Sequence, residues 1–270
     1  MLFSYFTKSL LRIKALWGWG VLFMVFYLVL GALVFGNELP KNLPVYAYVS
    51  YTSSWYALIN LYTLSSLAIS ISNSIMFATY SLSYCFRFTR LKPMSYLLNF
   101  VLSSIIVGLT MSSAIMISTY GLFSYQFNMN LAPANLLFIA GTLVLSSIFM
   151  FAFSTLLVLL LINYLGLRNQ SFISFIPLLL GFGFGFGQLY LSLPTLLLYA
   201  SPFTAAIGLL YHGYSGLSVP VTLAIGLDNG SLDVNYLIIS LASWAAILLL
   251  IDSYFLSRIK PRMIEEMRQI

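Results

Sequence analysis

Long runs without charged residues are the feature that most limits what this chain can fold into. Only 7% of the 270 residues are charged and 61% are hydrophobic, and no Asp, Glu, Lys or Arg occurs from Asn169 to Leu227. A soluble domain carries about a quarter charged residues, so this chain lacks the polar surface to cover itself in water. In lipid such runs must be helices, because their backbone groups find no water to bond. The sequence predicts an all-α integral membrane protein with a single transmembrane domain over residues 1–270.

Six apolar stretches, separated by charges or turn residues, predict six membrane spans. Each is near or above the length of about 20 residues that a helix needs to cross a bilayer. They lie at residues 17–36, 55–80, 95–120, 135–165, 171–199 and 235–257.

The basic residues predict which side of the membrane each loop occupies. Cytoplasmic loops of membrane proteins carry an excess of Lys and Arg. With a cytoplasmic N-terminus, eleven of the twelve basic residues fall inside and only Lys41 falls outside. The eleven are Lys8, Arg12, Lys14, Arg87, Arg90, Lys92, Arg168, Arg258, Lys260, Arg262 and Arg268. We expect a multi-pass protein of the cell membrane with both termini in the cytoplasm.

The uncharged segment 201–227 is long enough to cross the membrane, but a full crossing would place the basic C-terminal tail outside. Proline and glycine residues also divide it into short pieces. We therefore expect residues 200–233 to form a re-entrant or interfacial helical hairpin on the outer side, after the fifth span. The same loop carries the sequon Asn229-Gly230-Ser231, which makes Asn229 a candidate glycosylation site.

The first sixteen residues predict a helix in the membrane interface. Large apolar residues recur there at three- and four-residue steps and share one helical face, while polar and basic residues share another. The apolar set is Phe3, Phe6, Leu10, Ile13 and Trp17, and the polar set is Ser4, Lys8 and Arg12. This pattern is typical of a helix lying at the membrane surface. An early start of the first span is the alternative.

The sequence offers little support for metal or nucleotide chemistry. One histidine, the single cysteine Cys85 and six acidic residues do not cluster at metal-ligand spacing. No Gly-Lys dipeptide of a P-loop occurs. We expect no catalytic residue and no cofactor, and we attribute the net charge of +6 to membrane orientation rather than to nucleic-acid binding.

One short motif matches an enzyme family. Gly213-Tyr214-Ser215-Gly216 fits the GxSG of rhomboid intramembrane proteases, which also have six spans. In those enzymes the base is a histidine on a later span, whereas the only histidine here, His212, precedes the serine. A glycine-rich turn is the preferred interpretation.

The second span carries a polar stripe. Tyr62, Ser66, Ser70 and Asn73 are spaced by four, four and three residues, which places them on one helical face. In membranes such residues more often bond neighbouring helices than contact a ligand, so packing is the preferred interpretation. The alternative is a transport path, for which Ser66, Ser70 and Asn73 are the candidate lining residues.

Strongly ionisable residues are absent from mid-span positions. Asp252 lies near the inner end of the last span, where Arg258 or solvent is expected within reach. Transporters coupled to ion gradients usually expose ionisable residues at the midplane. Energy is therefore expected from another source.

The loop after the second span, residues 81–94, mixes aromatic and basic residues. Arg87, Phe88, Arg90 and Lys92 precede Pro93, which starts the next helix. Three cations beside aromatic side chains suit docking on a partner protein. An ordinary loop touching anionic lipid is the alternative.

Together these features resemble the membrane subunit of type 2 ABC transporters, the permease class that works with a separate ATPase. The resemblance covers nearly the whole chain as architecture, from the N-terminal interfacial helix to the broken hairpin after the fifth span. Two short motifs add to it: Leu91-Lys92-Pro93-Met94-Ser95 at the entry to the third span, and Ser201-Pro202-Phe203-Thr204 at the start of the hairpin. The acidic-and-glycine signature that many members carry before that proline is missing here.

The resemblance implies a dimer in the lipid bilayer, of two copies or of this chain with a homologue, above two ATPase subunits. ATP hydrolysis would occur in those partners, and the permease would export an amphipathic, lipidic or peptide-like substrate by alternating access. The residues expected to contact the ATPase are Arg87, Phe88, Arg90 and Lys92. An ion-coupled secondary transporter and a membrane scaffold without transport are the alternatives.

Residues 181–187 read GFGFGFG. A phosphate loop would need a lysine, and a strand in lipid would leave its edges unpaired, so a helix is expected. On a helix Gly181 and Gly185 form one shallow groove, and Gly183 and Gly187 form another on the nearly opposite face. The segment is then either a deformable hinge beside the path or a site of tight static packing. In the hinge interpretation, an apolar constriction of the path is formed by Phe182, Phe184 and Phe186.

Overall fold

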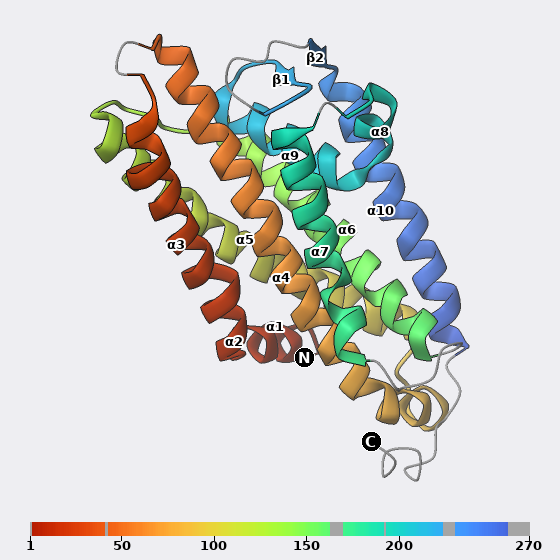
Figure 1. The fold of residues 1–270 in the computed structure, drawn as a ribbon. Helices are drawn as coiled ribbons and strands as arrows, with labels where there is room; N and C mark the ends of the chain where they lie inside the picture. Colours follow the sequence, from red (N-terminus) through yellow and green to blue (C-terminus); the bar gives the residue numbers. More distant parts are fainter. Residues whose placement is uncertain (1, 41–42, 163–169, 192, 224–229, 259–270) are drawn as a thin grey trace.

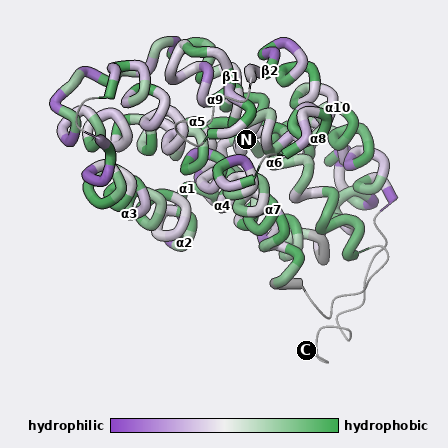
Figure 2. Tube along the Cα trace, turned by 45° about the horizontal axis from the view of Figure 1, so that its top comes forward, coloured by the Kyte–Doolittle hydropathy of each residue, from purple (hydrophilic) through white to green (hydrophobic). Residues whose placement is uncertain are grey.

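The computed structural model describes residues 2–40, 43–162, 170–191, 193–223 and 230–258. Six helical stretches within them are long and apolar enough to cross a membrane, and Figure 1 shows them as one bundle. The predicted all-α, multi-pass membrane architecture is therefore confirmed. The six stretches are Lys14–Glu38, Val45–Ala78, Pro93–Phe127, Leu136–Leu160, Phe172–Tyr190 and Val234–Ser257. Figure 2 shows hydrophobic residues along most of the helices and hydrophilic residues mainly at turns and helix ends.

The first span is composite, whereas the other five are regular α-helices. Two π-helices, which carry one extra residue per turn and are often found at functional sites, interrupt it. In order it consists of α2 (Lys14–Trp17), the π-helix η1 (Gly18–Leu22), α3 (Phe23–Val29), the π-helix η2 (Leu30–Val34) and the 3-10 helix η3 (Phe35–Glu38). The regular helices are α4 (Val45–Phe88), α5 (Pro93–Phe127), α6 (Leu136–Leu160), α7 (Gln170–Tyr190) and α10 (Val234–Ser257).

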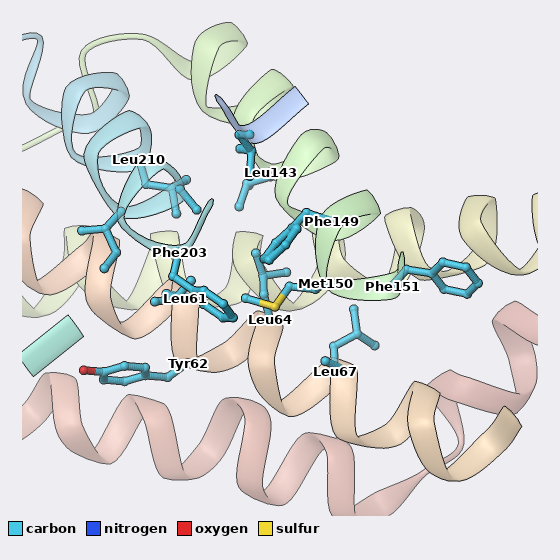
Figure 3. Close-up of a cluster of buried hydrophobic side chains, with 14 of the residues drawn as sticks. Leu61, Tyr62, Leu64, Leu67, Leu143, Phe149, Met150, Phe151, Phe203 and Leu210 are labelled. Carbon is cyan, nitrogen blue, oxygen red and sulfur yellow. The ribbon is translucent and has the colours of Figure 1, made fainter. Parts of the chain in front are cut away.

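Helix α4 lies at the centre of the bundle and contacts α3, α5, α6, α7 and the short helix α9 (Pro202–Ser215). Its core-facing leucines are fully buried and lie against large side chains of α6 and α9 (Figure 3). These residues are Leu61, Leu64 and Leu67 on α4, with Phe149, Met150 and Phe203 facing them. The ring of Tyr62 belongs to the same buried cluster but points to the side of α4 that faces the first span (Figure 3). One face of α4 therefore anchors the core, and another is left for the groove between spans.

Helix α1 (Leu2–Leu11) is separate from the first span. The backbone is extended at Ile13, and α1 lies across one end of the bundle (Figure 1). Phe6 stacks on Phe100 of α5 with ring centroids 4.9 Å apart, and the Ser103 hydroxyl donates to the Phe3 carbonyl oxygen at 3.0 Å. This end, which also holds the turn between α4 and α5, is termed the basic end, and the opposite end is termed the distal end.

Short elements close the distal end (Figure 1). Helix α8 (Thr195–Ala200) is followed by α9, which is almost entirely buried. The hydroxyl of Ser201 caps α9 by accepting from the Thr204 N–H, and Gly216, at φ +69°, ends it in a conformation that favours glycine. With 14 residues, α9 is about 21 Å long, which is shorter than the ~30 Å hydrocarbon core of a bilayer.

The expected helical hairpin over residues 200–233 needs correction, because its described return limb is not helical. After Gly216 the chain is extended, and β1 (Val219–Pro220) pairs antiparallel with β2 (Ser231–Leu232). Valine and proline at these positions favour extended backbone over helix. Residues 224–229, including the candidate glycosylation site Asn229, lie outside the described residues.

The largest errors in the predicted spans are at the start of the second and the end of the fifth. Helix α4 begins at Val45, well before the predicted start at residue 55, because polar residues such as Thr52 and Ser53 are buried by neighbouring helices instead of facing lipid. Helix α7 ends at Tyr190 instead of continuing to residue 199. Pro194 follows, and its ring disfavours a helical conformation of the residue before it, so the next residues form the separate helix α8.

Candidate functional site: a groove between the first and fifth spans

Helices α3 and α7 both pack against α4 and leave a groove between them. Its larger part, a cavity of about 830 Å³, lies toward the basic end. Its smaller part, of about 470 Å³, lies toward the distal end. Both are lined by the first span, α4 and α7. Volumes of about 300–1,000 Å³ are typical of small-molecule sites, so this groove is the candidate functional site.

The polar stripe on α4 faces the groove. Ser66, Ser70 and Asn73 line the larger part, and Tyr62 lines the smaller part. The Ser66 and Ser70 hydroxyls have no hydrogen-bond partner among the described residues. The Asn73 side-chain oxygen accepts a hydrogen bond from the Ser174 hydroxyl of α7 at 3.1 Å. The three residues predicted for the path are thus brought together on one wall of the same cavity.

An aromatic contact separates the two parts of the groove. The rings of Tyr62 and Phe182 lie 4.2 Å apart between centroids, at an interplanar angle of 31°. Phe182 lines both parts, and Phe186, which stacks beside it at 5.9 Å, lines only the smaller part among the described residues. The side chains of Tyr62 and Phe182 therefore form a narrow point between two mainly apolar compartments, of which the larger also carries the polar stripe of α4.

Phe184 does not share this groove. Its ring stacks on Phe203 of α9 at 5.6 Å, with the two planes 8° apart. It lines a separate cavity of about 240 Å³ between α6, α7, α8, α9 and α10. Of the three phenylalanines in GFGFGFG, two face the groove and one holds α7 against α9.

The glycines of α7 divide in the same way. A Cβ atom added to Gly185 would lie 2.5 Å from the Tyr62 hydroxyl oxygen, and one added to Gly181 would lie 2.8 Å from the Ser65 hydroxyl oxygen. Both glycines allow close approach of α7 to α4. A Cβ atom on Gly183 would meet nothing within 4 Å, and one on Gly187 would make an ordinary contact with Leu193 at 3.4 Å.

The first span forms the opposite wall, and its π-helices lie beside the two compartments. Trp19 of η1 lines the larger part, and Leu30 of η2 lines the smaller part. A Cβ atom on Gly31 would come within 2.6 Å of the Trp55 ring of α4. Sequence reasoning did not predict these π-helices; the only available signal was the cluster of glycines in an otherwise apolar span.

The residues predicted to contact an ATPase lie at the turn between α4 and α5. Arg87, Phe88, Arg90 and Lys92 are all exposed, Phe88 to 80%, and none of the three cations forms an ion pair with a described residue. Residues 81–94 are not an independent element, because α4 continues to Phe88 and α5 starts at Pro93. The side chain of Phe86 turns inward, with its ring 6.0 Å from that of Tyr96.

Asp252 differs from the sequence-based expectation. It is fully buried (0% exposed), and neither carboxyl oxygen has a hydrogen-bond partner among the described residues. Arg258 instead lies over the Tyr254 ring, 4.3 Å from its centroid. The two residues are six apart, which is more than one and a half helical turns, so they leave α10 on different sides.

The GxSG motif forms a closed turn at the end of α9. The Ser215 hydroxyl donates to the Tyr211 carbonyl oxygen at 2.8 Å and accepts from the Leu217 N–H at 3.0 Å. His212 Nδ1 lies 2.7 Å from the Leu217 carbonyl oxygen. These contacts support a structural turn. Among the described residues, no group of three or more His, Cys, Asp or Glu side chains could hold a metal ion.

Comparison with models of known protein families found no match to this chain, and comparison with curated protein sequences found none. The functional proposal therefore depends on the groove and the exposed turn.

Proposed function

We propose that this chain is the membrane-spanning permease subunit of a type 2 ABC transporter, which exports an amphipathic substrate with energy from a partner ATPase. The main support is the groove along α4, whose two compartments share Phe182, with the contact between Tyr62 and Phe182 lying where they meet. A path with compartments toward both ends and a narrow point between them is what alternating access needs.

In this proposal the basic end faces the cytoplasm and α1 lies in the membrane interface. The exposed turn with Arg87, Phe88, Arg90 and Lys92 docks on the ATPase. Two permeases, identical or homologous, place their grooves toward each other in the bilayer above two ATPase subunits. Hydrolysis takes place in those subunits, so the permease itself needs no cofactor. The α8–α9 region and the following return then lie on the outer side.

Movement of the groove walls would open the narrow point. The first span contains two π-helices, and α7 contains four glycines and Pro177, each of which weakens a regular helix. The floor, α4, is one α-helix of 44 residues. Walls that deform against a regular floor would separate Tyr62 from Phe182 without disturbing the leucine core.

The decisive experiment starts from the reading frames that neighbour this chain's gene. Where one of them encodes an ATPase with a Walker motif, that ATPase is co-expressed with the chain, and co-purification and transport are measured. The double variant Arg87→Glu, Arg90→Glu should abolish ATPase co-purification and ATP-driven transport, because it reverses two exposed charges on the docking turn. Thermal stability should not change, since neither arginine has an ion-pair partner among the described residues. Arg12→Glu, at an exposed position between α1 and α2, is the matched control. Unchanged co-purification and transport by the double variant would rule out this docking role.

Asp252 favours a second candidate, an ion-coupled secondary transporter. An unpartnered carboxyl group inside a membrane bundle is costly, and such residues often mark proton or ion pathways. In vesicles without ATP, substrate accumulation driven by a proton gradient and lost in Asp252→Asn would support this candidate. ATP-dependent transport that persists in Asp252→Asn would support the ABC permease. A membrane scaffold would transport under neither condition.

A further inference from the structure

The larger compartment of the groove has unused hydrogen-bond donors. Ser66 and Ser70 are 7% and 9% exposed, line the cavity, and have hydroxyls without a partner among the described residues. Asn73 also lines the cavity; its side-chain oxygen accepts from the Ser174 hydroxyl, and its amide nitrogen can only donate. A ligand that supplies hydrogen-bond acceptors can satisfy all three groups, because the serine hydroxyls can donate as well.

The charge beside the compartment is positive. Lys14 is exposed between Ile13 and Ala15, which both line the cavity, and it forms no ion pair with any described residue. No acidic side chain is among the described residues that line either part of the groove. Lys14 itself is not among the lining residues, but one unpaired cation beside a compartment without acidic groups favours an anionic ligand over a cationic one.

The rest of the lining is mainly apolar. Phe175, Leu178 and Ile69 are among the apolar residues of the larger compartment. Past the narrow point the lining is mainly aromatic and aliphatic, with Leu30, Phe186 and Leu189, although the hydroxyl-bearing residues Tyr27, Tyr51, Ser54 and Tyr190 also line this part. This surface suits a hydrocarbon chain, which gains free energy by contacting apolar side chains. Hydrogen-bond donors and a cation at one end of a long, mainly apolar groove fit a molecule with an acceptor-rich anionic group at one end and an apolar chain at the other.

We propose that the groove binds an anionic amphiphile, that is, an alkyl chain carrying an acceptor-rich carboxylate or phosphate head group. The head group lies against Ser66, Ser70 and Asn73 beside Lys14, and the chain extends past Tyr62 and Phe182 toward the distal end. This proposal rests on the proposed function, for which it names the substrate class, but its test needs neither ATP nor a partner.

The test is equilibrium binding to the purified full chain in a neutral maltoside detergent. The probes are tritiated stearate, tritiated oleoyl lysophosphatidate and tritiated methyl stearate, which has the chain of stearate without the charge. We expect saturable binding of at least one anionic probe, and about tenfold weaker binding of the methyl ester, as for loss of one charge-assisted hydrogen bond. The preferred anion distinguishes a carboxylate from a phosphate head group.

The variants test where the head group lies. Lys14→Gln and the pair Ser66→Ala, Ser70→Ala should each weaken binding of the preferred anion about tenfold, while binding of the methyl ester changes little. The matched controls are Lys8→Gln, at an exposed position of α1, and Ser113→Ala, an exposed serine of α5 whose hydroxyl already donates to the Leu109 carbonyl oxygen. Both controls should leave the affinity for the anion unchanged.

Several results would overturn the proposal. Equal affinity for stearate and its methyl ester would remove the head-group site. If Lys8→Gln and Lys14→Gln weaken binding of the anion equally, the contribution of Lys14 comes from general surface charge and not from a position beside the head group. Saturable binding of none of the probes would indicate a groove filled by a second copy of the chain. If instead the anion binds as expected but no ATP-driven transport is found, the proposed function fails while this binding site stands.

Discussion

The two sides of α7 use the same residue type for different purposes. On the side that faces α4, Gly181 and Gly185 are buried and leave no room for a Cβ atom. On the outward side, Gly183 is exposed and faces open space. The phenylalanines divide differently, since Phe182 meets Tyr62 and borders the open groove whereas Phe184 stacks on Phe203. An alternating motif in the sequence thus becomes a helix whose sides differ in packing.

The largest difference between the two sides should come from the phenylalanines. Phe184→Ala should destabilise the protein by about 2–3 kcal/mol, because it leaves a cavity against Phe203, with little change in transport per folded molecule. Phe182→Ala should destabilise the protein less, because the Phe182 ring borders an open groove. The loss of this ring should, however, join the two compartments and increase the passage of substrate across the membrane without ATP. Thermal unfolding and vesicle transport measure the two effects. If Phe182→Ala and Phe184→Ala lose equal stability and allow equal passage of substrate without ATP, the two phenylalanines do not have different roles.

The glycines should show a smaller difference. Gly185→Ala should destabilise the protein by about 1–2 kcal/mol through overpacking against Tyr62, partly offset by the better helix propensity of alanine. Gly183→Ala is the matched control and should be neutral or stabilising by up to about 1 kcal/mol. Thermal unfolding of purified protein decides between them. If Gly183→Ala is instead strongly destabilised, we would infer that another chain packs against the outward side of α7.

The smallest effect is a coupling energy that locates the close contact. Tyr62→Phe removes the hydroxyl that lies 2.5 Å from the Cβ position of Gly185, so the double variant Tyr62→Phe, Gly185→Ala should recover about 1 kcal/mol relative to the sum of the single changes. Tyr62→Phe combined with Gly183→Ala should be additive. A double-mutant cycle of unfolding free energies checks this, and additivity in both cycles would exclude Tyr62 as the obstacle.

Helical periodicity accounts for most of what could be predicted from the sequence. Apolar runs located six spans, and the spacing of Ser66, Ser70 and Asn73 placed them on one face, which the structure turns toward one cavity. The same rule put Phe182 and Phe184 on different sides of α7 but could not say which side faces a path. The side that faces a path depends on how the helices pack against one another, and this packing is set by contacts between residues far apart in the sequence.

The errors in the sequence-based predictions also come from long-range packing. Thr52 and Ser53 were not predicted to lie in a span, because they are buried by neighbouring helices and their polar side chains resemble those of a loop. The environment of Asp252 depends on α10 turning it into the bundle and away from Arg258. The π-helices of the first span lie where this span packs against α4 and α5, and Gly20 and Gly31 allow close contact there with Met111 and Trp55. No periodicity in the sequence predicts them.

The length of α4 has a mechanical consequence. Its 44 residues form a rod of about 66 Å, roughly twice the hydrocarbon thickness of a bilayer of ~30 Å. Buried residues occur along this helix from Ala47 to Leu82, with the leucine core near the middle. An axial displacement of the end beside Arg87 would therefore be carried by one continuous, packed helix to the distal mouth of the groove.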